Sequence, residues 1–280
     1  MSHRQSGPPI MGLRVILLTI LGGLLLSGCQ DFFVYHPTTD DERSLLSMAN
    51  QKGLEPWYGE EGERIGWYAG TNRREKARRV IIFHGNGGQA IDRDHYVRGF
   101  QGPRADEAWE VYILEYPGYG SRAGKPSEGA FIQAAREGVE YLLKETPGEP
   151  LYVVGTSLGS GVASQVAAAY PDSIPAILLI TPFTNIEDVG ATSVPRFLVR
   201  LLLRDRYDNE KALSRYAGRV GMLLAGADHV VPTELGRRLY EGYEGEKRLW
   251  LQPGAGHNTL DYDPTSELWA EVTAFFLGSK

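Results

Sequence analysis

The sequence predicts an α/β protein with a mostly parallel central sheet and helices on both faces. Short apolar runs rich in Val, Ile and Leu recur along the chain, and an amphipathic stretch fits between most neighbours. These runs are RRVIIFHG, WEVYILEY, PLYVVGTS, PAILLITP, RVGMLLAG and KRLWLQPG. Because parallel strands need a crossover connection between them, this alternation is typical of a sheet covered by helices on both sides.

The first thirty residues have the order of a bacterial export signal. Arg4 and Arg14 precede an apolar stretch from Val15 to Leu26, and small residues follow it. As a helix this stretch would rise about 18 Å, against about 30 Å for the hydrocarbon core of a bilayer. We therefore expect residues 1–28 to be a cleaved signal peptide rather than a membrane span.

Cys29 is the only cysteine in the sequence, so it can form neither an internal disulfide nor a Cys-rich metal site. Leu26-Ser27-Gly28-Cys29 resembles the lipobox of bacterial lipoproteins, which implies that Cys29 is acylated and becomes the new N-terminus. The alternative is a small buried cysteine behind a plain signal peptide or a short anchor. Gln30, in place of a retention Asp, favours the outer membrane. We expect a lipid-anchored protein of the bacterial cell envelope that faces the periplasm.

The remaining residues, 29–280, suffice for one α/β domain. The net charge is −6 and basic residues are scattered, so nucleic-acid binding is not expected. The glycines of GYGSRAGKPS miss the spacing of a dinucleotide fingerprint and of a P-loop, which predicts a structural loop.

The order of elements within this domain follows from the same pattern. Residues 33–44 are interpreted as a tether to the domain, and residues 64–70 as an early strand. Ser127 is a plausible N-cap, with Glu128 near the positive end of the helix dipole. The expected helices are 89–101, Ser127–Lys144, Leu158–Tyr170, Pro232–Tyr243 and Thr265–Leu277. Residues 184–216 exceed a simple crossover and contain VPRFLVRLLL, an apolar helix expected to form a small lid on the sheet.

Gly155-Thr156-Ser157-Leu158-Gly159 lies between a predicted strand and a predicted helix. This is the context of a G-x-S-x-G nucleophile elbow, where a serine on a strained turn exposes its hydroxyl. The glycines remove bulk where strand and helix approach each other. An ordinary glycine-rich turn with a capping serine is the alternative.

A serine nucleophile needs a base and an acid that orients it. His257 lies in the glycine-rich loop QPGAGHNTL after the last predicted strand, and Asp228 follows the preceding strand. Asp205 and Asp208, after the lid, are rival acids, because the acid can move between strand ends in related folds. The chain order Ser157, Asp228, His257 is the one expected of an α/β-hydrolase.

A tetrahedral oxyanion needs donors as well. The amide of Leu158 directly follows the nucleophile, and the loop HGNGG (84–88) offers Asn86 as the second donor, with Gly87 as the alternative.

From about Tyr35 to its end the chain resembles the α/β-hydrolase superfamily, within it the Bem46-like and serine-aminopeptidase-like branch. The matching segments are HGNGG, EYPGYGSRAGKPSEGA, GTSLGSG, ITPFTN, RDRYDN, GADHVVP and GAGHN. Where that branch usually carries Asp-Tyr, this chain has Glu115-Tyr116, a position outside the triad.

We therefore expect a serine hydrolase that cleaves a carboxylic ester through an acyl-enzyme, without metal or cofactor. A peptidase, an acyl transferase, a lysophospholipid hydrolase and a non-catalytic envelope binding protein remain alternatives. The substrate is expected to be a small or lipid-like acyl compound. The apolar side chains of the lid could contact its acyl chain, although burial on the sheet is the default. They are Phe197, Leu198, Leu201, Leu202 and Leu203.

Overall fold

The computed structural model describes residues 34–71, 77–102 and 107–278. Cys29, Gln30 and the expected signal peptide lie outside the described residues. Within those ranges no helix is long and apolar enough to cross a membrane.

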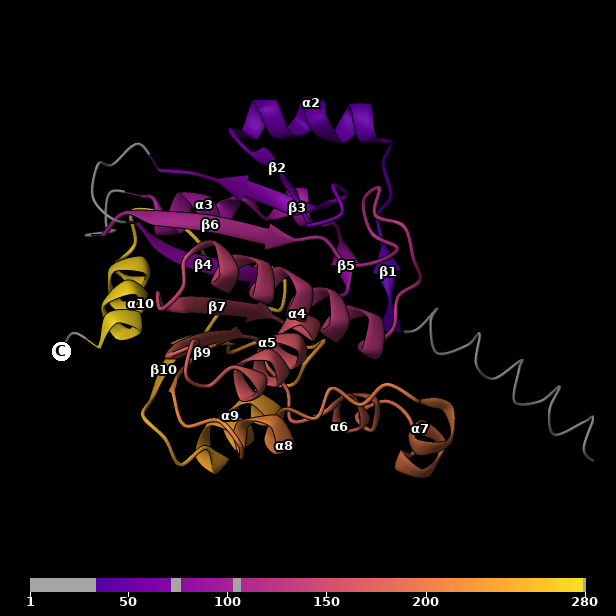
Figure 1. Ribbon diagram of the computed structural model, residues 1–280. Helices are drawn as coiled ribbons and strands as arrows, with labels where there is room; N and C mark the ends of the chain where they lie inside the picture. Colours follow the sequence, from indigo (N-terminus) through magenta and orange to yellow (C-terminus); the bar gives the residue numbers. More distant parts are fainter. Residues whose placement is uncertain (1–33, 72–76, 103–106, 279–280) are drawn as a thin grey trace, which may run out of the picture.

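An eight-stranded sheet forms the centre of the molecule (Figure 1). In spatial order its strands are β10 (Lys247–Gln252), β9 (Arg219–Ala225), β8 (Ala176–Ile180), β7 (Leu151–Thr156), β4 (Arg78–Phe83), β6 (Trp109–Leu114), β3 (Arg64–Ala69) and β2 (Glu55–Tyr58). Every neighbouring pair from β10 to β6 is parallel, whereas β3 is antiparallel to both of its neighbours. The predicted mostly parallel sheet is confirmed.

Helices cover both faces of the sheet because successive strand residues point to opposite sides. On β7, Val153 belongs to one buried cluster and Val154 to the other. The Val153 cluster includes side chains of α4 (Glu128–Glu145), α5 (Leu158–Ala169), α8 (Asn209–Leu213) and α9 (Thr233–Gly242). The Val154 cluster includes side chains of α2 (Glu42–Lys52), the 3₁₀ turn η1 (Ala90–Arg93), α3 (Asp94–Phe100) and α10 (Glu267–Leu277).

The five expected helices are present, with ends close to their predicted positions. Residues 89–101 divide into η1 and α3, and the others correspond to α4, α5, α9 and α10. The predicted N-cap is also found, since Ser127 Oγ accepts a hydrogen bond of 3.1 Å from the amide of Ala130. Local capping chemistry therefore sets where α4 begins.

The interpretation of residues 33–44 as a tether is wrong for the described part of that segment. Tyr35 is buried and stacks edge-on against Phe131 of α4, with ring centroids 5.2 Å apart. Strand β1 (His36–Pro37) pairs in parallel with β5 (Gly87–Gly88), and α2 begins at Glu42. The start of the described chain is thus part of the domain and lies beside the HGNGG loop.

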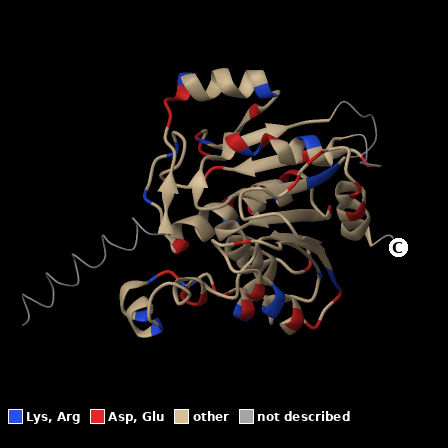
Figure 2. Cartoon of the chain, turned by 180° about the vertical axis from the view of Figure 1, so that it is seen from behind, with Lys and Arg blue, Asp and Glu red and all other residues tan. Residues whose placement is uncertain are grey.

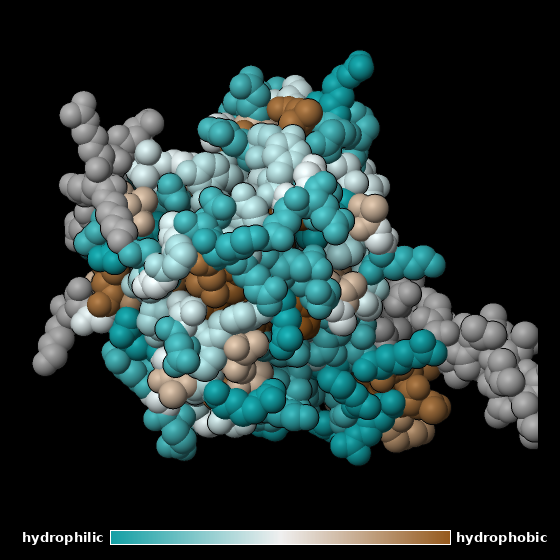
Figure 3. Space-filling model, viewed as in Figure 1, coloured by the Kyte–Doolittle hydropathy of each residue, from teal (hydrophilic) through white to brown (hydrophobic). Residues whose placement is uncertain are grey.

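The predicted lid segment forms α6 (Ile186–Gly190), α7 (Arg196–Leu202) and α8. Helix α7 lies at the edge of the molecule, away from the sheet (Figure 1). The default expectation of burial is wrong for two of its residues, because Phe197 is 70% exposed and Leu201 is 69% exposed. Hydrophobic side chains are visible at this corner in Figure 3.

Ion pairs join α7 to α6 instead. Glu187 accepts hydrogen bonds of 2.9 Å from Arg196 and 2.7 Å from Arg200, and Asp188 accepts one of 2.6 Å from Arg196. Both signs of charge gather along this segment in Figure 2. Because the arginines are about half exposed, these pairs are screened by solvent and hold α7 only weakly.

Candidate active site

Ser157 occupies the turn between β7 and α5 in a backbone conformation that non-glycine residues rarely adopt. Its φ is 52° and its ψ is −120°. A Cβ atom on Gly155 would clash with the carbonyl of Gly159, and one on Gly159 would clash with the carbonyl of Phe83. Strand and helix therefore approach this closely only because both positions are glycine. The turn has the geometry predicted for a nucleophile elbow.

Ser157, His257 and Asp228 are joined by a chain of two hydrogen bonds. His257 Nε2 is 2.9 Å from Ser157 Oγ, and His257 Nδ1 is 2.7 Å from Asp228 Oδ2. A carboxylate accepts the proton on Nδ1, which leaves Nε2 as the acceptor for the serine hydroxyl. Ser157, Asp228 and His257 follow the carboxyl ends of the parallel strands β7, β9 and β10, so the sheet brings together residues that are far apart in sequence.

The Asp228 carboxylate is held in its ionised form. Burial raises its pKa, but hydrogen bonds from His257 and from the amides of Val231 and Val230 outweigh burial, so the pKa lies below its ordinary value. The hydrogen bonds from the amides of Val231 and Val230 are 2.8 Å and 2.9 Å long, and both reach Asp228 Oδ1. Asp228 Oδ2 therefore remains for the imidazole.

Neither rival acid contacts His257. Asp205 Oδ2 accepts a hydrogen bond of 2.5 Å from the hydroxyl of Tyr35. Asp208 is the N-cap of α8 and accepts from the amide of Lys211. Asp228 is therefore the carboxylate that the fold places against the imidazole.

Leu158 and the HGNGG loop line the same side of the serine. Leu158 is the first residue of α5, where an amide has no acceptor within its own helix. The backbone of Gly85 lies against Ser157, because a Cβ there would be 3.4 Å from the serine Cβ. Asn86 and Gly87 follow and line the pocket together with Leu158.

Asn86 is fixed by three hydrogen bonds. Its carbonyl accepts from the amide of His36 at 2.9 Å and from the hydroxyl of Tyr119 at 2.7 Å. Its Nδ2 donates to the carbonyl of Val34 at 3.1 Å. Tyr119 belongs to GYGSRAGKPS, so this segment is the structural loop that the sequence predicts, and it supports the Asn86 peptide.

A buried pair lies beneath the loop. His84 and Glu115 are both fully buried, with His84 Nε2 3.5 Å from Glu115 Oε1. Glu115 Oε1 also accepts from the amide of Ala90, and His84 Nδ1 is 2.8 Å from the carbonyl of Gly85. Glu115 thus holds the loop from below and takes no part in the Ser157 hydrogen-bond chain.

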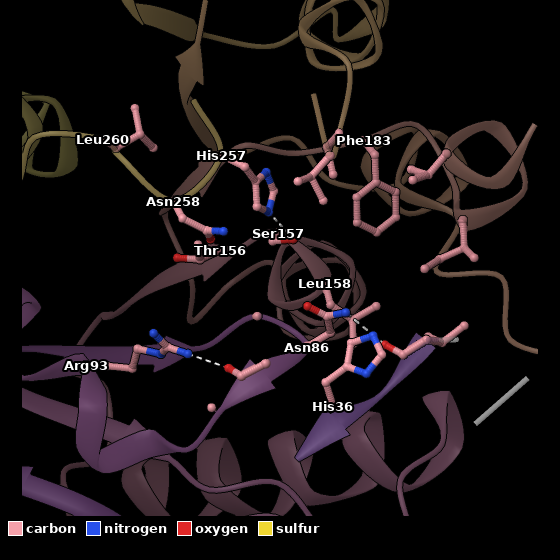
Figure 4. A pocket seen from close by; sticks show the side chains of 18 of the residues that line it. His36, Asn86, Arg93, Thr156, Ser157, Leu158, Phe183, His257, Asn258 and Leu260 are labelled. Atoms are coloured by element: carbon pink, nitrogen blue, oxygen red, sulfur yellow. Dashed lines mark hydrogen bonds between the residues drawn. The ribbon is translucent and has the colours of Figure 1, made fainter. Parts of the chain in front are cut away.

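A pocket of about 930 Å³ opens above Ser157. Some of its apolar side chains belong to the Val153 cluster or pack against it, among them Val34, Phe183, Ile186, Val189 and Leu203. Others, Tyr96, Leu260 and Tyr262, belong to the Val154 cluster or pack against it. Polar side chains also line it, among them Asp92, Arg93, His95, Thr156 and Asn258. In Figure 4, Ser157 lies between Phe183 on one side and Arg93 and Asn258 on the other.

Sequence reasoning did not assign most of the other pocket residues, among them His36 and Arg93. His36 falls in the segment interpreted as a tether, and Arg93 falls in an expected helix where an arginine gives no signal of its own. Pairing of β1 with β5 and the turn of η1 bring both to the pocket. Within the described ranges, no group of three or more His, Cys, Asp or Glu side chains could hold a metal ion.

Comparison with known proteins identifies the fold family. Residues 78–213 match the family model described as alpha/beta hydrolase fold. The uncharacterized protein Rv2307c of Mycobacterium tuberculosis is 31% identical over 202 residues, which cover 71% of this chain and 70% of that protein. The chain belongs to the α/β-hydrolase fold family.

Another relative of this α/β-hydrolase, and solved structures with the same fold, have named activities or ligands. The lysophosphatidylserine lipase ABHD12 of Danio rerio is 30% identical over 179 residues, covering 58% of this chain and 46% of that protein. The esterase Pf2001 of Pyrococcus furiosus superposes with a TM-score of 0.64 at 16% identity, covering 88% of this chain and 99% of that one. Est1E of Butyrivibrio proteoclasticus, solved with ferulic acid, gives a TM-score of 0.63 at 20% identity, covering 76% and 93%. These structures share the fold.

Proposed function

We propose that the protein is a serine hydrolase that cleaves a carboxylic ester through an acyl-enzyme. The observation that carries this proposal is the hydrogen-bond sequence from Ser157 Oγ through His257 to Asp228, with distances of 2.9 Å and 2.7 Å. His257 takes the hydroxyl proton as Ser157 attacks the acyl carbonyl, then donates it to the leaving alcohol. Asp228 stabilises the imidazolium, and water releases the acyl group by the same route.

The developing oxyanion is assigned to the backbone amides of Leu158 and Asn86. Both residues line the pocket beside Ser157, and Asn86 is held rigidly by its three hydrogen bonds. One preorganised donor of this kind is worth about 3–4 kcal/mol of barrier. Gly87 is the alternative second donor, since it lines the same wall.

An ester with an apolar acyl group suits the pocket best. Phe183, Ile186 and Leu203 offer a hydrocarbon chain an apolar surface, and relatives of known activity include a lysophosphatidylserine lipase. Peptide hydrolysis, by resemblance to the serine-aminopeptidase-like branch, is the second candidate. A non-catalytic binding protein would have no use for a serine held at a positive φ, because such strain costs stability and is typical of functional sites.

We also propose that Cys29 carries a lipid anchor that holds the protein on the periplasmic face of the outer membrane. Val34 lies five residues after Cys29 and lines the pocket. Five residues of extended chain span at most about 18 Å, so the anchor would keep the pocket close to the lipid surface. Metabolic labelling with an alkyne analogue of palmitate tests this: the wild type should be labelled and Cys29→Ser should not.

The hydrolase proposal is tested by initial rates on a series of acyl esters from short to long chains, with Ser157→Ala as the control. Activity that disappears in the control supports the serine mechanism. The optimum chain length shows how long an acyl chain the apolar side of the pocket accepts. Full esterase activity in Ser157→Ala would refute the proposal. Hydrolysis of aminoacyl amides in preference to esters would favour the peptidase.

A further inference from the structure

Arg93 stands out among the polar pocket residues because its guanidinium forms no ion pair with a residue that the structure describes. Among the residues that the structure describes, no carboxylate lies within 4.0 Å of its guanidinium. Its Nη2 donates to the carbonyl of Gly87 at 2.5 Å, and its Nε is buried without a partner. A guanidinium has five N–H donors, so most of its binding capacity remains available.

The HGNGG loop is shaped around this side chain. Gly88 has a φ of +81°, and a Cβ there would lie 2.7 Å from Arg93 Nη2. A larger residue would therefore push the guanidinium away from the loop. Since the same loop supplies Asn86 beside Ser157, Arg93 is held in a fixed place relative to the serine.

Arg93 also contributes to the electrostatics of its surroundings. Burial is the main cause that lowers the pKa of His95 to about 4, and the positive charges of Arg93 and Lys52 lower it further. His95 is thus neutral at pH 7. Asp92 lines the pocket too, but it is exposed, and its charge is screened by solvent more strongly than that of the half-buried Arg93.

We propose that Arg93 binds an anionic group on the alcohol side of the ester, so that the substrate combines an apolar acyl chain with a phosphate or carboxylate in its leaving group. The proposal rests on the serine hydrolase function. Ser157 lies between Phe183 and Arg93, so the scissile carbonyl would have its acyl chain toward the apolar wall and its alcohol toward the guanidinium (Figure 4). Arginine suits this task because its planar fork binds phosphate and carboxylate oxygens in pairs.

Matched esters test this assignment in the full chain. One pair is monooctanoylglycerol and octanoylglycerol 3-phosphate, which differ by the phosphate. The other is 4-octanoyloxybenzoate and its neutral carboxamide. The readout is the ratio of kcat/KM for the charged ester to kcat/KM for its neutral partner, because this ratio cancels general losses of activity. We expect a ratio of about ten or more for wild type in at least one pair, and that pair identifies the anion.

Three variants separate anion binding from a structural role. Arg93→Gln should lower the ratio about ten-fold, and Arg93→Lys, which keeps the charge but loses the fork, should retain part of it. Arg98→Gln is the matched control, since Arg98 lies on α3, is 57% exposed and pairs with Asp94. Its ratio should stay within two-fold of wild type.

Each other outcome has a defined meaning. Equal losses on charged and neutral esters in Arg93→Gln would overturn the proposal and leave Arg93 as a support for Gly87. A wild-type ratio near or below one in both pairs would also overturn it, while Ser157-dependent hydrolysis would keep the hydrolase function. Absence of hydrolysis of every ester would refute both.

Discussion

The β7–α5 turn and the α6–α7 segment both border the pocket, but they are held by different forces. At the turn, Gly155 and Gly159 allow backbone to pack on backbone, and Ser157 is 8% exposed. In α7, Phe197 and Leu201 face solvent, and solvent-screened ion pairs provide much of the attachment. The turn that holds Ser157 is rigid through close packing, whereas the α6–α7 segment, which borders the proposed acyl side of the pocket, can change without disturbing that turn.

Loss of the nucleophile or the base should give the largest effect. Ser157→Ala and His257→Ala should each lower kcat by about 10⁴- to 10⁶-fold, because the residues of a triad act as a unit. Steady-state rates on the best ester measure this, and thermal unfolding should show that both variants remain folded. Residual activity within ten-fold of wild type would show that Ser157 and His257 do not carry the reaction.

Asp228→Asn should lower kcat by about 10⁴-fold, because an amide stabilises the wrong imidazole tautomer. The same carboxylate has a pH signature. Its folded pKa lies below the ordinary 3.8, so its ionised form stabilises the protein above that pH, and the contribution is lost as the pH falls through the folded value. Tm measured from pH 6 to pH 3 should therefore fall more steeply for wild type than for Asp228→Asn. Parallel curves would contradict the assignment.

Gly159→Ala tests the packing of the turn directly. A methyl group there meets the carbonyl oxygens of Phe83 and His84, so we expect a loss of about 2–4 kcal/mol in the free energy of unfolding. Gly129→Ala in α4 is the matched control, because nothing lies within 4 Å of a Cβ at that position. The control should be neutral or up to about 1 kcal/mol more stable. Urea unfolding of both variants provides the comparison.

The smallest effects are expected in α7. Phe197→Ser removes an exposed side chain and should change the free energy of unfolding by less than about 0.5 kcal/mol. Val199→Ala, which removes buried methyl groups that pack near Gly190, should cost about 1–3 kcal/mol. A larger loss of stability in Phe197→Ser than in Val199→Ala would contradict the exposed position of the Phe197 side chain.

The sequence predicted the parts of the fold that have strong periodicity. The buried β-branched strands and the Gly-x-Ser-x-Gly turn leave few alternatives, so the sheet, five helices and the positions of Ser157 and His257 followed from local pattern. Strand β2 and β1 were not recognised, because short edge strands carry little hydrophobic signal and depend on pairing with distant segments. Arg93 was missed for a related reason, since its place in the pocket depends on Gly87 and Gly88.

The position of the lid was likewise predicted better than its packing. VPRFLVRLLL has the composition of a buried helix, but in α7 only Val199 is fully buried among its described residues. Arg196 and Arg200 on the same helix bind the carboxylates of α6 and orient it. Long-range charge pairs of this kind cannot be read from the apolar pattern alone.

The most direct test of the central claim is covalent labelling of the wild-type protein with a fluorophosphonate, followed by peptide mass mapping. An activated Ser157 should carry the phosphonyl group in stoichiometric yield, and labelling should slow strongly in His257→Ala and disappear in Ser157→Ala. A modified residue other than Ser157, together with ester hydrolysis that persists in Ser157→Ala, would contradict the account.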